Sequence, residues 1–154
     1  MALKMDRQVD AVDISFFLNE VAERGVIVSV STGGSGISMD SPKSLATVAA
    51  SSQNARPLGC LLNDFVDIDP TRVPLNWFKD QHRLGDKCTI LTKGWVVTNK
   101  IVGTPLAGQL AVLASSGFLA PVAVGTASSA NSPLVGQFRS GVNEDGFAKV
   151  YIDL

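Results

Sequence analysis

Short apolar runs recur along the second half of the chain, residues 85–154, and glycine, proline, asparagine or serine residues separate them. The runs are about five to eight residues long and rich in Val, Ile, Leu, Thr and aromatic residues, which is typical of β-strands joined by tight turns. In the last run, apolar positions alternate with polar or aromatic ones, which places Ala148, Val150 and Ile152 on one face. We therefore expect a sheet in which this last run is one of the strands.

Turn signals divide this half of the chain into strands. A Lys93–Gly94 turn is expected between two strands, a Ser116–Gly117 hairpin turn follows, and residues 143–146 predict a last hairpin turn. The Asp-Gly pair that ends this last turn readily supplies the positive φ that such turns need. Residues 121–133 are rich in small residues and predict a loop or an extended piece that its neighbours support.

The first half of the chain predicts fewer regular elements. Residues 26–31 are rich in β-branched residues and predict a strand, and residues 57–69 predict another. Residues 14–24 fit either a short helix or an irregular strand that ends at Gly25. Residues 44–52 fit either a strand or a helical turn.

Length and composition indicate one folded domain. The chain has 154 residues, of which 45% are hydrophobic and 18% are charged, and this is enough apolar sequence for one proper core. Residues 13–154 are predicted to be a single β-rich domain, whose strand-dense core spans residues 85–154. The predicted fold is mainly β, a small β-barrel or sandwich of short antiparallel strands with an extended N-terminal arm and long loops.

Residues 1–12 are predicted to be that arm. They are polar, with isolated apolar side chains at Leu3, Met5, Val9 and Val12. Such a segment has little to bury by itself, so it is either a flexible terminus or an arm that lies on a neighbouring subunit. We expect its deletion to leave the fold intact.

Charge and hydropathy exclude two classes of partner. The net charge is −1 and the basic residues are scattered singly, which disfavours a nucleic-acid partner. No apolar run approaches the roughly 20 residues that a membrane-spanning helix needs, and the first residues lack the apolar centre of a secretory signal. We therefore expect no nucleic acid, no membrane, and synthesis in the cytoplasm.

The two cysteines and the single histidine match no zinc motif. Cys60 and Cys88 are not part of a CxxC pair, and His82 lies shortly before Cys88. Free buried thiols are the favoured interpretation, and a disulfide stays open. Cys88 with His82 is the one pair on which a catalytic site can be argued, but nothing in the sequence indicates the orienting third group. No catalytic residue is predicted, and the chain is not expected to be an enzyme.

Two further stretches could be taken for ligand-binding sites, but a loop without a ligand is favoured for both. The glycine-rich loop at residues 32–36 lacks the lysine of a phosphate-binding loop and the spacing of a dinucleotide loop, so it predicts a hairpin tip or linker. Asp64, Asp67 and Asp69 lie at the acidic end of the strand candidate 57–69, and a solvated loop is favoured there over a calcium or magnesium site. No metal or cofactor is predicted.

A segment with two prolines, residues 70–84, carries large apolar side chains. Its prolines oppose regular strand pairing, so Leu75, Trp77 and Phe78 either cap an open end of a barrel or act as anchors at an interface. Together with the apolar residues of the arm they are the candidate interface residues: Leu3, Met5, Val9, Val12, Leu75, Trp77 and Phe78.

The order of the elements in the second half carries a resemblance. Glycine-led and hairpin-joined strands follow one another at residues 85–90, 93–97, 107–112, 116–119, 135–138 and 145–152. This succession resembles the small all-β decoration, or cement, proteins of tailed-bacteriophage capsids, whereas residues 1–83 align with nothing in them. The resemblance implies a structural virion protein, synthesised in the host cytoplasm, that binds the exterior of the phage head and bridges major capsid protein subunits. It also implies a homo-oligomer, of which we favour a trimer.

A second interpretation is a small β-barrel that binds a ligand or carbohydrate, as a module of a phage tail or cell-surface protein. Such a module needs a concave site lined by aromatic side chains with a few convergent polar groups. The chain supplies Trp77, Trp95 and Tyr151 for this purpose, so finding them clustered and exposed would favour this interpretation.

Overall fold

The structure is a computed structural model that describes residues 3–31, 45–48, 50–62, 66–68, 78–82, 84–123, 125 and 132–154. At residues 66–68 and 78–82 it describes the backbone alone. The fold is mainly β, as predicted, and the one helix of the described residues is the short 3-10 turn η1 at Ser115–Gly117.

The strands are short except for one. The strands of the first half are β1 (Gln8–Asp13), β2 (Phe17–Leu18), β3 (Ala22–Glu23), β4 (Ile27–Val30), β5 (Leu45–Thr47), β6 (Pro57–Leu61), β7 (Val66–Ile68) and β8 (Phe78–His82). The second half contributes the nine-residue β9 (Ile90–Thr98), followed by β10 (Leu110–Leu113), β11 (Leu119–Val122), β12 (Leu134–Phe138) and β13 (Ala148–Asp153).

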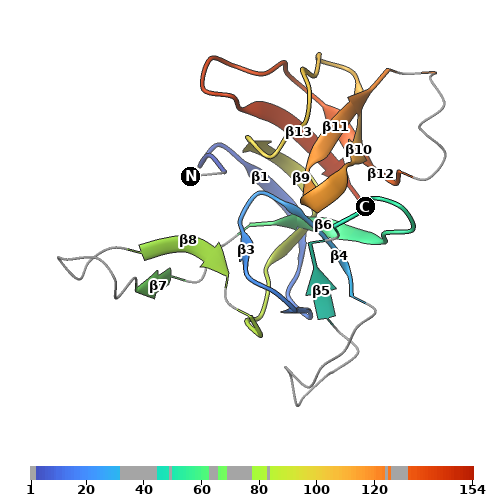
Figure 1. Ribbon diagram of the computed structural model, residues 1–154. Helices are drawn as coiled ribbons and strands as arrows, with labels where there is room; N and C mark the ends of the chain where they lie inside the picture. Colours follow the sequence, from blue (N-terminus) through green and yellow to red (C-terminus); the bar gives the residue numbers. More distant parts are fainter. Residues whose placement is uncertain are drawn as a thin grey trace.

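Ten strands form one sheet in the order β11-β10-β12-β13-β9-β6-β4-β5-β2, with β1 attached to β9. All its pairings are antiparallel except the parallel pair of β2 and β5. A separate small sheet has the order β3-β8-β7, and β7 and β8 extend from one side of the body (Figure 1). Within the described residues the end strands β11 and β2 do not pair, so the large sheet is open.

Strand β9 joins the two halves of the sheet. Its residues 93–98 pair with β13, whereas Ile90 and Leu91 pair with β6. Side chains from both halves meet in one cluster, in which Ile27 of β4 is buried together with Phe138 of β12. The sheet therefore folds over a shared core, as in a small β-sandwich.

The last strand follows its predicted alternation. Ala148, Val150 and Ile152 are at most 1% exposed and belong to the core, whereas Tyr151 is half-buried and Asp153 is exposed. The predicted hairpin turns are also present, because η1 joins the antiparallel strands β10 and β11 and a tight turn precedes β13. In this turn Gly146 has the expected positive φ of 83°.

The predicted turn at Lys93–Gly94 is wrong, because β9 runs through both residues. Gly94 is there for a different reason. Its φ is 140°, and a Cβ atom at this position would lie 2.2 Å from the carbonyl oxygen of Gln8 in β1. The missing side chain lets the neighbouring strand approach closely.

Two further predictions are corrected in detail. Of the two alternatives for residues 14–24, the irregular strand is found, as the two-residue strands β2 and β3. The strand predicted at residues 57–69 covers 57–61, and Val66–Ile68 forms the separate strand β7. Residues 85–89 contribute a single bridge, between Phe17 and Lys87, instead of a strand. The strand at residues 26–31 is confirmed as β4, and the segment 44–52 contains the short strand β5.

The N-terminal segment does not separate from the domain at residue 12. Leu3 forms a bridge with Thr98 and the amide of Lys4 donates to the carbonyl oxygen of Val97, so residues 3–13 run antiparallel along β9. Strand β1 crosses the predicted boundary, and Leu3 is a core residue at 2% exposure. Deleting residues 1–12 would therefore remove a core side chain as well as a strand.

Candidate functional site

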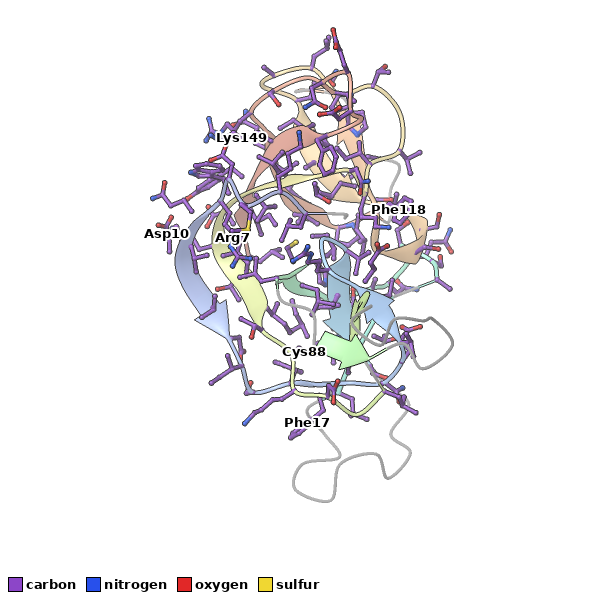
Figure 2. The ribbon with its side chains drawn as sticks, turned by 90° about the vertical axis from the view of Figure 1, so that its left-hand side faces the viewer. Arg7, Asp10, Phe17, Cys88, Phe118 and Lys149 are labelled. Atoms are coloured by element: carbon purple, nitrogen blue, oxygen red, sulfur yellow. The ribbon has the colours of Figure 1, made fainter. Side chains whose placement is uncertain are left out.

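Strand β1 lies at an edge and buries almost none of its side chains. All residues from Gln8 to Val12 are exposed, and the strand pairs with β9 and with no other described strand. Figure 2 shows β1 at the side of the molecule, with Asp10 pointing away from the body. The strand is held by its backbone ladder and leaves its side chains to solvent.

Four large apolar side chains on and beside this edge are exposed, and we call them the N-terminal apolar strip. Met5 is 89% exposed, Val9 45%, Val12 46% and Ile14 57%. Single exposed apolar residues are ordinary on protein surfaces, whereas here four of them occur on one short segment. Sequence reasoning missed Ile14, because it was assigned to the start of a helix or strand; its position between Asp13 and Ser15 was the available signal.

Polar contacts fix this segment on the body. The indole nitrogen of Trp95 donates to the side-chain oxygen of Gln8 at 2.8 Å, and the hydroxyl of Thr92 donates to the carbonyl oxygen of Ala11 at 3.2 Å. The guanidinium of Arg7 also donates to the carbonyl oxygen of Leu62, at 3.4 Å. The apolar strip is therefore presented on an ordered backbone.

The turn that follows β1 is closed by Asp13. Its carboxylate accepts hydrogen bonds from the hydroxyl of Ser15 at 2.6 Å and from the amide of Ser15 at 2.7 Å. These two bonds favour the ionised form and lower the pKa of Asp13. Ile14 lies between Asp13 and Ser15 in the chain and is exposed.

The predicted interface residues divide into four groups. Met5, Val9 and Val12 lie on the surface strip, whereas Leu3 is buried in the core and is not available for contact in the single chain. Leu75 and Trp77 lie outside the described residues. Phe78 begins β8, of which the structure describes the backbone.

Other candidate ligand positions fall partly outside the described residues. This applies to the glycine-rich loop at 32–36 and to Asp64 and Asp69, and Asp67 and His82 are described by their backbone alone. Among the residues that the structure does describe, no three His, Cys, Asp or Glu side chains are grouped so that they could hold a metal ion.

Both cysteines are free thiols inside the body. Cys60 is 0% and Cys88 is 1% exposed, so the disulfide that the sequence left open is not formed. Burial raises the pKa of each thiol from its ordinary value of 9.0 to about 12. A thiol with such a pKa stays protonated at neutral pH, and the thiolate is the nucleophile.

We expect maleimide to label both thiols at pH 8 at least about 100-fold more slowly in the native protein than in urea. The unfolded chain loses these protons from about pH 9, whereas the folded chain keeps them until about pH 12. Stability should therefore fall as the pH rises above about 9. Rapid labelling of native Cys88 would contradict this account and restore a Cys88 nucleophile as a hypothesis.

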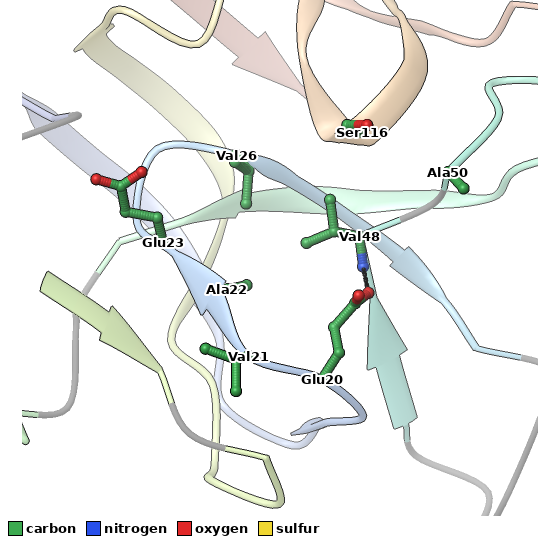
Figure 3. Close-up of a pocket in the computed structure, with 8 residues that line it drawn as sticks. All are labelled: Glu20, Val21, Ala22, Glu23, Val26, Val48, Ala50 and Ser116. Atoms are coloured by element: carbon green, nitrogen blue, oxygen red, sulfur yellow. Dashed lines mark hydrogen bonds between the residues drawn. The ribbon is translucent and has the colours of Figure 1, made fainter. Parts of the chain in front are cut away.

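One hollow, of about 310 Å³, lies beside η1 between the turn after β2 and the end of β5 (Figure 3). The carboxylate of Glu20 accepts hydrogen bonds from the Val48 amide and the Thr47 hydroxyl, and Glu23 forms a salt bridge with Lys100. The carboxylates at this hollow thus fasten the body's own segments to each other.

A second hollow, of about 340 Å³, lies on strands β10, β12 and β13. One of its lining residues, Tyr151 of β13, is directly opposite Trp95 of β9 in the ladder, and both are half-buried. Each ring has a cation near it: Lys149 Nζ is 3.3 Å from the centroid of Trp95, and Arg139 Cζ is 5.3 Å from that of Tyr151. The third aromatic residue of the predicted platform, Trp77, lies outside the described residues.

No helix among the described residues is both long and apolar enough to cross a membrane. No protein-family model matches the chain, and no curated protein is significantly similar to it in sequence.

Proposed function

We propose that the chain is a capsid decoration protein, a structural and non-catalytic component that binds the exterior of a phage head and bridges major capsid protein subunits. The observation that carries this proposal is the N-terminal apolar strip on the edge strand β1. Such a strand offers another chain apolar side chains and a backbone edge at the same place.

The energetics suit a protein that acts in many copies. Covering one valine or isoleucine side chain contributes about 1.5–3 kcal/mol at most, and these residues are already partly covered. Each attachment is therefore modest. A decoration protein gains from repetition, because a linked second contact binds at a high effective concentration across each seam of the shell.

The strand succession in the second half supports the same proposal. Strands β9 to β13 occupy the stretch whose order resembles decoration proteins. Two pieces of that resemblance are lost: β9 is continuous through the Lys93–Gly94 turn, and residues 85–89 form a single bridge instead of a strand. The proposal therefore depends chiefly on the apolar strip.

We extend the proposal to a homotrimer at threefold positions of the capsid lattice. Closed cyclic assemblies are the usual way in which soluble homo-oligomers cover exposed edges and apolar patches. Within the described residues the end strand β11 of the open sheet is such an edge, and it is separate from β1, which we assign to the capsid contact.

Sedimentation with expanded heads that lack the protein tests the proposal. We expect saturable co-sedimentation, in copies that are a multiple of three per lattice site, and little weakening as NaCl rises, because apolar contacts are not screened by salt. Heads that already carry the protein are the control and should bind no more. A stable monomer that binds no head would contradict the proposal.

A further inference from the structure

The second hollow lies on the face of strands β10, β12 and β13 that points away from the core, and it is open to solvent. Its walls come from three strands and the residue after β12. The side chains that line it are Leu110, Leu134, Gln137, Arg139, Tyr151 and Asp153. The volume of about 340 Å³ is at the lower end of the range for small-molecule sites.

An irregularity in β12 accompanies this hollow. The pairing of β10 with β12 shifts in register between Ala111 and Val112. The strand has glycine at position 136, where a Cβ atom would lie 1.9 Å from the carbonyl oxygen of Tyr151. Bulges of this kind re-aim side chains at sites on a sheet, and here one position of the strand adds no side chain to the wall.

The polar groups of the hollow converge on one flat ring. Gln137 is directly opposite Tyr151 in the ladder, and the guanidinium carbon of Arg139 lies 5.3 Å from the Tyr151 ring centroid. Asp153 follows Tyr151 by two residues, on the same face of β13. Gln137 is oriented by a hydrogen bond of 3.0 Å from its side-chain nitrogen to the carbonyl oxygen of Gly108.

The ionic groups here remain accessible to a ligand. Arg139 is exposed. Asp153 is 3.5 Å from Lys93, but both side chains are more than half exposed, so this pair is weak and can yield to another partner. The hollow thus offers a cation, an anion and an amide around an aromatic ring.

We propose that this hollow binds a saccharide, which lies beside the Tyr151 ring and whose hydroxyl groups bond to Arg139, Asp153 and Gln137. A sugar hydroxyl both donates and accepts hydrogen bonds, so it can bond to the guanidinium and to the carboxylate. A purely apolar ligand would bury these charged groups without partners. A phosphate-rich ligand would meet the carboxylate of Asp153.

The proposal does not rest on the decoration function. Strand β9 lies between β1 and β13, so the hollow and the N-terminal apolar strip are on different edges of β9. Trp95 does not line the hollow, and its indole nitrogen bonds to Gln8.

Ligand-observed NMR with methyl pyranosides of glucose, galactose, mannose and N-acetylglucosamine tests the proposal. We expect saturation transfer from the native chain to at least one of them, with a Kd on the order of 1 mM. The variants R139Q and Y151T should each weaken this binding by about tenfold or more. The matched control is K149Q, which removes a positive charge from a cation–aromatic contact on the same face but outside the hollow, and it should bind as the native chain does.

Three results would overturn the proposal. One is the absence of saturation transfer from the protein to any of these sugars at a sugar concentration of about 10 mM, which is 10-fold the expected Kd. Another is equal loss of binding in K149Q and R139Q, when circular dichroism shows both variants folded. The third is stronger binding of an oligothymidylate, which would identify the face as a stacking surface for single-stranded nucleic acid. Head binding by R139Q and Y151T should be unchanged, so failure here and failure of the decoration proposal are distinguishable.

Discussion

Replacing Phe138 by alanine should lower the free energy of unfolding by about 3–5 kcal/mol. Phe138 is among the largest side chains that are fully buried, and it lies in the cluster that both halves of the sheet share. Its removal loses the transfer free energy of the ring and leaves a cavity that the surrounding strands can only partly fill.

Urea denaturation followed by circular dichroism measures this change. The control is Leu134→Ala in the same strand, where the side chain is 54% exposed and the expected change is within about 0.5 kcal/mol. The slope of the transition should be the same in all three proteins, because they expose similar surface on unfolding. Similar losses in both variants would show that Phe138 does not hold the two halves together.

Replacing Gly94 by alanine should detach β1 from β9 at a cost of about 2–4 kcal/mol. The added Cβ atom would lie 2.2 Å from the carbonyl oxygen of Gln8, and this oxygen belongs to backbone that cannot rotate away. Alanine is also strained at the φ of 140° found here. The ladder between the two strands must open to relieve the contact.

Hydrogen exchange of the β1 amides reports this opening, and we expect their protection to fall at least about tenfold. Gly108→Ala is the matched control, because Gly108 has a φ of 93° but nothing within 4 Å of a Cβ atom. It should share the backbone strain and leave β1 protected. If β1 keeps its protection in the Gly94 variant, then β1 is not packed against β9 as described.

The parts of the fold that were predictable depend on local patterns. The alternation in β13 and the β-branched run in β4 show which residues form strands, because side chains alternate between the two faces of a sheet. The hairpin turn at residues 143–146 was predictable because Asp-Gly is a strong local turn signal. Gly94 was misassigned because glycine serves both turns and close strand contacts, and its partner Gln8 lies far away in the sequence.

The candidate sites were predictable only in part, for the same reason. Leu3 and Met5 both appear as isolated apolar residues in a polar segment, yet the bridge of Leu3 to Thr98 buries one and leaves the other 89% exposed. Nothing near either residue in the sequence reveals that bridge. Trp95 and Tyr151 were selected as rare aromatic residues. Their pairing follows from the register of β9 and β13, which cannot be read from the composition.

Photo-cross-linking on phage heads tests most directly the central claim, that β1 is the surface which contacts the capsid. A benzoylphenylalanine is placed at Val12 in the N-terminal apolar strip, and a control one at Leu106, which is 66% exposed on the loop before β10. We predict a light-dependent product between the Val12 variant and the major capsid protein, and none from the Leu106 variant. No product at Val12 from a variant that still binds heads, or equal products at both positions, would contradict the account.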